Sequence, residues 1–236
     1  MTGSYTYTFE DIQNRPVAVI GAGTLGRRVA LMFASRGGTV RIHARRAEQL
    51  AAATRYVTET LPKVVAARGS GEVGVATAAG SLEEALDDAW LAIESVPEKL
   101  EIKIPLWGQI DQAAPPDTIF ATNSSSYPSR LMAENVRDKT RLCNIHFYMP
   151  PEINAVDLMS DGETDRACST PCWPSSLSSA SILSRRARSA PASFSIASGL
   201  PSSVSRWPWL PKAWPVPRTS TGCSRSTGAC RPDRFR

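Results

Sequence analysis

A short apolar segment followed at once by a glycine-spaced turn constrains the fold of this chain most. Residues 16–20 read PVAVI, a β-branched segment with the length of a buried parallel strand. Residues 21–26 read GAGTLG, and apolar side chains four apart then predict a helix: Leu25, Val29 and Phe33. A strand, G-x-G-x-x-G and a helix, in that order, form the context in which such glycines bind a dinucleotide.

Each glycine of this turn has a physical role in that context. Gly21 allows the tight turn, Gly23 lets a pyrophosphate approach the backbone, and Gly26 lets the helix pack closely on the strand. The helix starts at Thr24 and Leu25, so its unpaired N–H groups would face the phosphates. We therefore predict that these five residues bind a cofactor. The alternative is a strand-to-helix turn without a ligand.

The first 165 residues continue as strands that alternate with helices. Further short strands are expected at 39–43, 74–77, 90–94, 118–121 and 141–148. A helix from about 47 to 61 is expected to end at Pro62, and Ser81 with Glu84 forms a capping box for the next helix. This alternation predicts an α/β fold with a doubly wound parallel sheet of the Rossmann type, as one dinucleotide-binding domain over residues 1–165. Ligands of such sheets bind outside the carboxyl ends of the strands.

The composition changes abruptly after this domain. The net charge of +5 combines 16 basic and 21 acidic residues in 1–165 with 11 basic residues and one acidic residue in 166–236. The second segment also holds 17 serines and nine prolines, and it has no sustained helical or strand period. We expect this low-complexity tail to be disordered, because it has little apolar surface to offset the entropy of ordering.

Three interpretations of the tail compete. An Arg/Ser-rich tail that contacts nucleic-acid phosphates fits poorly with its clustered tryptophans and prolines. A disulfide framework is conceivable for its four cysteines, but nothing upstream resembles a secreted protein. A reading frame shifted by one base permits VLDALLAEL over 167–175 and PGFIFNRLWAAIKRESLAVVAEGV over 190–214, both with helical spacing and balanced charge. We hypothesise that one base is missing near Asp165, so that residues 166–236 are out of frame.

The end of the second expected strand bears on the choice of nicotinamide cofactor. NAD sites usually place an acid there to bind the ribose 2′-hydroxyl, whereas this chain has Ala44 followed by Arg45 and Arg46. A carboxylate would repel a 2′-phosphate, and guanidinium groups would pair with it. The residues therefore favour NADP over NAD, and the alternative is that both arginines are solvated charges at a helix start.

Two polar segments lie near strand ends where a substrate is expected, TNSSS at 122–126 and HFYMPP at 146–151. An imidazole such as that of His146 suits the removal of an alcohol proton at neutral pH. The alternative is a structural histidine, which is our interpretation of His43; Cys143 is expected in the core. We see no transmembrane segment or signal peptide and expect a cytoplasmic protein without a metal site, with mitochondrion and peroxisome left open.

These segments together resemble the 3-hydroxyacyl-CoA dehydrogenase family. VAVIGAGTLGRRVALMFASRG, AIESVPEKLEIK, FATNSSSYP, NIHFYMPP and AVDLMSDGETD occur in the family's order and spacing, over roughly residues 14–165. The resemblance implies NAD(P)-dependent oxidation of a β-hydroxy group to a ketone by hydride transfer, with a hydroxyacyl substrate. It also implies a helical C-terminal domain that closes the cleft and forms a homodimer interface. The shifted string GFIFNRLWAAIKRE resembles its start, so we expect this chain to lack the interface and to be impaired.

The resemblance assigns roles only where motifs match. His146 corresponds to the catalytic base and Ser125 to the serine that hydrogen-bonds the substrate oxygen, while Glu98 and Lys103 match positions at the nicotinamide end of the cofactor. A glutamate farther along the chain orients the family's histidine, and the candidate here, after a one-residue gap, is the shorter Asp157. This change, and HFYMP in place of the family's HFFNP, indicate a divergent branch with an altered substrate.

A second class of function stays open. The aspartate in place of the glutamate and the altered C-terminal half both favour a dinucleotide-binding module without catalysis. Binding of nucleic acid through the basic tail is the third and least favoured interpretation, and it predicts a steep dependence on salt. We expect neither a nucleic acid nor a membrane as a partner.

Overall fold

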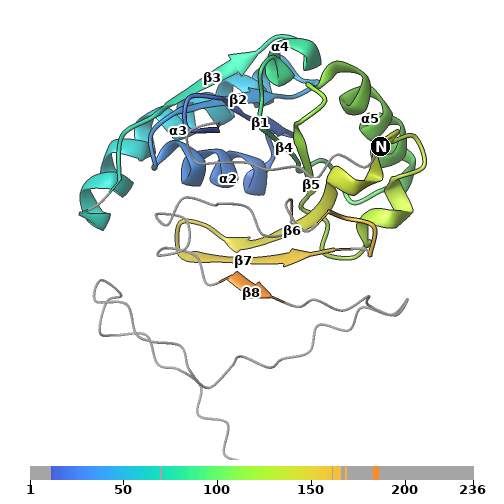
Figure 1. The fold of residues 1–236 in the computed structure, drawn as a ribbon. Helices are drawn as coiled ribbons and strands as arrows, with labels where there is room; N and C mark the ends of the chain where they lie inside the picture. Colours follow the sequence, from blue (N-terminus) through green and yellow to red (C-terminus); the bar gives the residue numbers. More distant parts are fainter. Residues whose placement is uncertain (1–11, 70, 161, 166–167, 169–182, 186–236) are drawn as a thin grey trace, which may run out of the picture. The chain divides into compact units, whose positions relative to one another are not determined.

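A computed structural model describes residues 12–69, 71–160, 162–165, 168 and 183–185, and a mostly parallel sheet lies at its centre (Figure 1). The strand order is β3-β2-β1-β4-β5-β6-β7-β8. The strands are β1 Val17–Ile20, β2 Thr39–His43, β3 Val75–Ala79, β4 Leu91–Glu94, β5 Ile119–Thr122, β6 Leu142–Met149, β7 Ile153–Met159 and β8 Leu183–Arg185. Strands β1 to β6 pair in parallel, whereas β7 runs antiparallel to β6. The predicted doubly wound sheet is confirmed.

The order reverses at β1, whose residue Val17 lies opposite Val40 of β2 on one side and Leu91 of β4 on the other. In doubly wound sheets this switch point opens the crevice that receives ligands. All four residues of β1, β4 and β5 are buried, because helices cover both faces of the sheet there. The expectation of a disordered tail falls almost wholly outside the described residues and stays a prediction.

Helices α2 (Thr24–Ala34) and α3 (Ala47–Arg68) cover one face of the sheet, and α4 (Leu82–Leu86) and α5 (Leu100–Ala113) cover the other (Figure 1). Two short 3₁₀ helices, η1 (Ser129–Met132) and η2 (Lys139–Arg141), precede β6. Alternate side chains of β1 divide between two apolar cores, with Val19 toward α2 and Ile20 toward α4 and α5. No helix of the described residues is both long and apolar enough to cross a membrane.

The prediction that Pro62 ends the second helix is wrong. Helix α3 runs to Arg68 and ends at Gly69, which takes a left-handed conformation with φ +67°. Proline removes one hydrogen bond to the carbonyl four residues earlier, here that of Thr58. Both residues are exposed, so water can solvate the freed carbonyl. Burial of Val57 and Leu61 on the inner side keeps the helix in place across this defect.

One half of the capping box expected at the start of α4 is present, because the Glu84 carboxylate bonds the amide of Gly80 rather than that of the N-cap Ser81. The Ser81 hydroxyl accepts from the Glu84 amide at 3.1 Å, and the Glu84 carboxylate accepts from the Gly80 amide at 2.7 Å. Cys143 is buried in β6, as expected.

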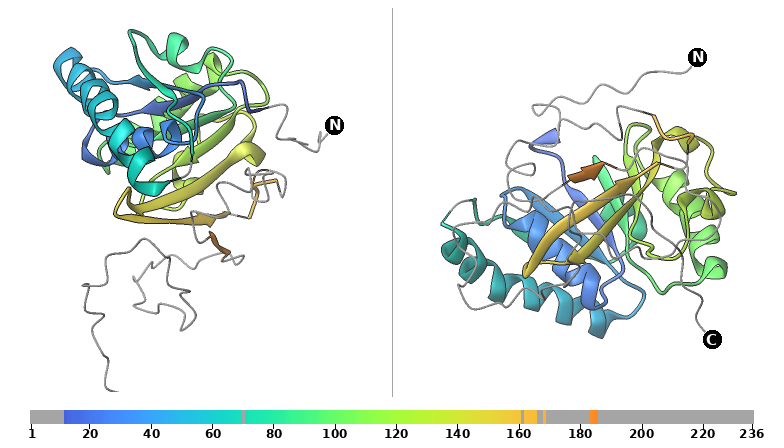
Figure 2. Two further views of the ribbon diagram at one scale, coloured as in Figure 1. Left: turned by 90° about the vertical axis from the view of Figure 1, so that its left-hand side faces the viewer. Right: turned by 90° about the horizontal axis from the view of Figure 1, so that it is seen from below.

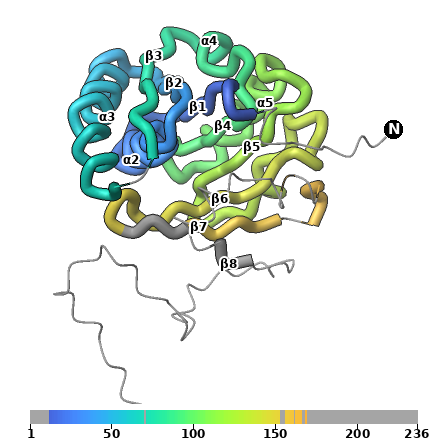
Figure 3. Tube along the Cα trace, turned by 60° about the vertical axis from the view of Figure 1, so that its left-hand side comes forward, coloured from blue at the N-terminus to red at the C-terminus, as the bar shows by residue number. Residues whose placement is uncertain are grey.

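Strands β6 and β7 form a hairpin beside α2 (Figures 2 and 3). Its turn contains a cis peptide bond between Pro150 and Pro151. Arg28 of α2 donates to the Pro150 carbonyl at 3.0 Å and contacts the Glu152 carboxylate at 2.5 Å. The helix that follows the glycine turn is thereby tied to the hairpin that carries His146.

Candidate functional site

A cavity of about 940 Å³ opens at the carboxyl ends of β1, β2, β4 and β5. It lies at the switch point, where the predicted fold places a ligand. The structure brings most predicted site residues to it: Gly21, Gly23, Thr24, Leu25, Arg45, Arg46, Glu98, Lys103 and Ser125 line the cavity. Gly26 lies beneath the turn, and His146 and Asp157 lie on the β6–β7 hairpin rather than in the lining.

The glycine turn has the backbone geometry that a pyrophosphate requires. Gly21 has φ +114°, and a Cβ there would lie 2.4 Å from the carbonyl oxygen of Ser95. A Cβ at Gly26 would lie 1.9 Å from the Gly21 oxygen, so strand and helix could not pack this closely with any larger residue. A Cβ at Gly23, by contrast, would meet nothing within 4 Å. This open backbone at the start of α2 can receive a phosphate group.

The end of β2 lines another part of the cavity through His43, Ala44, Arg45 and Arg46. Both arginines are exposed, and Arg46 is the N-cap of α3. His43 Nδ1 lies 3.1 Å from the Ala79 carbonyl, and its structural role stays a prediction. His43 also lines the cavity, which sequence reasoning missed; its place as the last residue of a parallel strand was the available signal.

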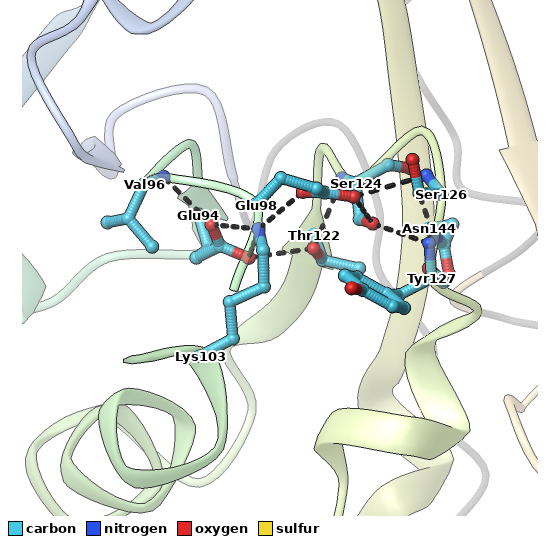
Figure 4. Close-up of polar contacts among 9 residues, drawn as sticks. All are labelled: Glu94, Val96, Glu98, Lys103, Thr122, Ser124, Ser126, Tyr127 and Asn144. Carbon is cyan, nitrogen blue, oxygen red and sulfur yellow. Dashed lines mark hydrogen bonds and ion pairs between the residues drawn. The ribbon is translucent and has the colours of Figure 1, made fainter. Parts of the chain in front are cut away.

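A buried ion cluster joins the ends of β4 and α5 (Figure 4). Lys103 Nζ lies 2.7 and 2.9 Å from the two carboxylate oxygens of Glu94 and 3.2 Å from Glu98 Oε2. The same Glu94 carboxylate accepts from the Val96 amide at 2.8 Å and from the Thr122 hydroxyl at 2.7 Å. Glu94 is fully buried, so these donors offset the cost of removing its charge from water.

Glu98 holds the loop after β5. Its Oε1 accepts from the Ser124 hydroxyl and, at 3.1 Å, from the Ser126 amide, on either side of Ser125. Burial raises the pKa of Glu98, but these hydrogen bonds and the Lys103 ammonium outweigh it and lower the pKa below its ordinary value. The carboxylate is therefore ionised at neutral pH.

Asn144 of β6 fixes the same loop from the other side (Figure 4). Its Nδ2 donates to the carbonyls of Ser124 and Tyr127, each at 3.2 Å. Asn123 completes the attachment by accepting from the Phe147 amide at 2.9 Å. Sequence analysis placed Thr122 and Ser124 only within the polar segment at 122–126 and did not single out Glu94 or Asn144. For Glu94 and Thr122 the available signal was a polar residue at the end of an otherwise apolar strand.

His146 lies two residues after Asn144, on the same face of β6, because side chains alternate along a strand. Its cross-strand neighbour is Asp157 of β7. The Asp157 carboxylate accepts from the Tyr148 hydroxyl at 2.7 Å, and the His146 and Tyr148 rings meet edge to face at 5.2 Å. No hydrogen bond or ion pair joins His146 to Asp157 in the part of the chain that the structure describes. The predicted dyad is thus aligned in register but not joined.

The described residues hold no group of three or more His, Cys, Asp or Glu side chains arranged to hold a metal ion.

Known proteins with the same pattern were found by sequence. A family model described as 3-hydroxyacyl-CoA dehydrogenase, NAD binding domain, matches residues 16–171. A 3-hydroxyadipyl-CoA dehydrogenase of Escherichia coli strain K12 is 32% identical over 158 residues, which are 63% of this chain and 33% of that protein. An L-carnitine dehydrogenase of Streptomyces coelicolor is 32% identical over 164 residues, which are 68% of this chain and 51% of that protein.

Solved structures agree with the sequence matches. A 3-hydroxybutyryl-CoA dehydrogenase from Escherichia coli K12 has a TM-score of 0.58 at 29% identity, over 66% of this chain and 34% of that one. The chain spans between 33% and 51% of the length of the two curated relatives described above.

Proposed function

This chain belongs to the 3-hydroxyacyl-CoA dehydrogenase family, and from that premise we propose that it oxidises a β-hydroxy group of an acyl substrate to a ketone, with a nicotinamide dinucleotide as hydride acceptor. One observation carries the proposal. A single cavity is lined by a glycine turn whose backbone is open at Gly23 and by a hydrogen-bonded loop at Glu98 and Ser125. A dinucleotide site needs both a backbone that binds the pyrophosphate and a second part of the cavity that holds the nicotinamide half.

The chain's own residues divide the work as follows. Gly23, Thr24 and Leu25 bind the pyrophosphate through backbone N–H groups. The Ser125 hydroxyl donates a hydrogen bond to the substrate oxygen, from a loop that Glu98 holds in place. The bound oxidised nicotinamide supplies the hydride acceptor.

His146 takes the hydroxyl proton as general base. The β6 residues before and after it, Asn144 and Phe147, are hydrogen-bonded to the loop that carries Ser125, so the strand places His146 near that loop. Asp157 places a carboxylate opposite His146 on the same face of the hairpin.

The substrate class follows from the family, and its carrier is a separate question. The matched relatives include one whose name contains a CoA ester and one, the L-carnitine dehydrogenase, whose name does not. We therefore assign a β-hydroxyacyl substrate, and an assay must offer both a 3-hydroxyacyl-CoA and a free β-hydroxy acid. The expected cytoplasmic location and the expected loss of the homodimer interface stay predictions.

We also propose that the cofactor site accepts the 2′-phosphate of NADP. The family model describes an NAD-binding domain. In this chain Ala44 removes the acid that would repel a 2′-phosphate, and Arg45 and Arg46 line the same part of the cavity.

One observation favours the second candidate, a dinucleotide-binding module without catalysis. The carboxylate of Asp157 is hydrogen-bonded by Tyr148 and not by His146. A histidine whose imidazole ring is not held in one orientation contributes less to the rate as a general base.

His146→Ala separates the two candidates. In a chain whose frame is restored after residue 165, the substitution is expected to lower turnover by about 100-fold or more, since general-base catalysis contributes that much. Cofactor binding by the 236-residue chain should stay nearly unchanged, because His146 does not line the cavity. Formation of reduced cofactor gives turnover, and calorimetric titration gives affinity. Turnover unchanged by the substitution would reject His146 as the general base, absence of turnover in the frame-restored wild type would leave only the binding module, and no cofactor binding by either chain would reject both candidates.

A further inference from the structure

The ion cluster of Glu94, Lys103 and Glu98 carries an unbalanced charge. It contains two carboxylates and one ammonium, which sum to −1. The side chains of Glu94 and Lys103 are 0% and 1% exposed, while that of Glu98 is 34% exposed and lines the cavity. Of the three side chains, Glu98 is therefore the one through which the excess negative charge faces the cavity.

The single ammonium of Lys103 has no donor left with which to compensate the second carboxylate. An ammonium has three donors, and Lys103 Nζ contacts three carboxylate oxygens, two on Glu94 and one on Glu98. The remaining donors to Glu98 are the neutral Ser124 hydroxyl and Ser126 amide. These orient the carboxylate without cancelling its charge.

The direction in which a dinucleotide would bind brings its nicotinamide half toward this charge. The end of β2 takes the adenosine ribose in this fold, and the start of α2 takes the pyrophosphate. The other half of the dinucleotide must then extend across the switch point toward the ends of β4 and β5. Glu98 and Ser125 line the cavity there.

We propose that the net negative charge of the Glu94–Lys103–Glu98 cluster makes this cavity discriminate between redox states and bind the oxidised nicotinamide more tightly than the reduced one. The oxidised ring is a cation and the reduced ring is neutral, so a nearby buried charge acts on only one of them. In a partly buried cavity that interaction is screened far less than at the surface. The inference rests on the proposed function, because it requires a nicotinamide dinucleotide in this cavity.

The test measures the dissociation constants of NAD⁺ and NADH on the full 236-residue chain, by calorimetry and by NADH fluorescence. Glu98→Gln removes the charge that borders the cavity and keeps the shape of the side chain. The ratio of the NADH constant to the NAD⁺ constant is expected to fall about tenfold, through weaker binding of NAD⁺.

Two matched variants control for position. Glu101→Gln removes the same charge from an exposed residue that also lines the cavity, and should change the ratio less because water and salt screen it. Glu59→Gln removes a charge from the exposed side of α3 and should leave the ratio unchanged. A merely structural role for Glu98 would weaken both cofactor forms equally and leave the ratio as it is.

The outcomes separate the two proposals. If neither cofactor form binds the chain, the proposed function fails and this inference with it. If both bind but Glu98→Gln leaves the ratio as in the wild type, or lowers it no more than Glu101→Gln, the cluster does not select the redox state, and the dinucleotide site itself stands.

Discussion

At the scale of single residues, our proposal is that the side chains at the end of β2 set which dinucleotide fits. Arg45 and Arg46 are exposed, so each is expected to contribute about 1 kcal/mol toward a 2′-phosphate, below the value for a buried charged hydrogen bond. Changing both to alanine should weaken NADP⁺ binding by about tenfold or more and NAD⁺ binding much less, as measured by calorimetric titration. Arg55→Ala, which removes an exposed charge from α3, is the control. Equal losses for both cofactors would mean that the arginines act as general surface charge.

The same scale shows what the residues alone could predict. Gly21, Gly23 and Gly26 were identifiable because their spacing carries a backbone requirement, and each has a different steric surrounding in the structure. The partner of Asp157 was not identifiable. The choice between Tyr148 and His146 depends on side-chain reach across a hairpin, which no spacing along the chain encodes.

At the scale of elements, α3 contains a removable defect. Pro62→Ala restores the amide that can bond the Thr58 carbonyl, and should raise the free energy of unfolding by about 1–3 kcal/mol, less the entropy that proline removes from the unfolded chain. The midpoint of urea unfolding measures it. Glu59→Ala, an exposed change on the same helix, should stay within about 0.5 kcal/mol. A less stable Pro62→Ala protein would mean that the proline ring packs favourably where it stands.

This helix also shows why element ends resist prediction. Periodicity placed its start at residue 47, but a proline stops a helix only when the lost hydrogen bond costs more than the continued packing returns. That balance depends on Leu61 being buried and Pro62 being exposed, which is tertiary information. The strands were easier, because short apolar runs between turns identify buried parallel strands directly.

For the whole molecule, we expect cofactor binding to depend on the residues before about 165 and turnover to depend also on the segment that follows them. Among the described residues, the last one that lines the cavity is Ser125, far before the change of composition near Asp165. Under the hypothesis that one base is missing there, restoring the frame should therefore change cofactor affinity little. Turnover is different, because an acyl substrate must be positioned and shielded from water, and positioning contributes several orders of magnitude to a rate. We expect the frame-restored chain to turn over at least about 100-fold faster than the 236-residue chain. The nucleotide sequence around Asp165 and parallel assays of both chains test this. Equal rates would make the described domain sufficient for catalysis, and an intact frame in the gene would assign residues 166–236 to the native protein.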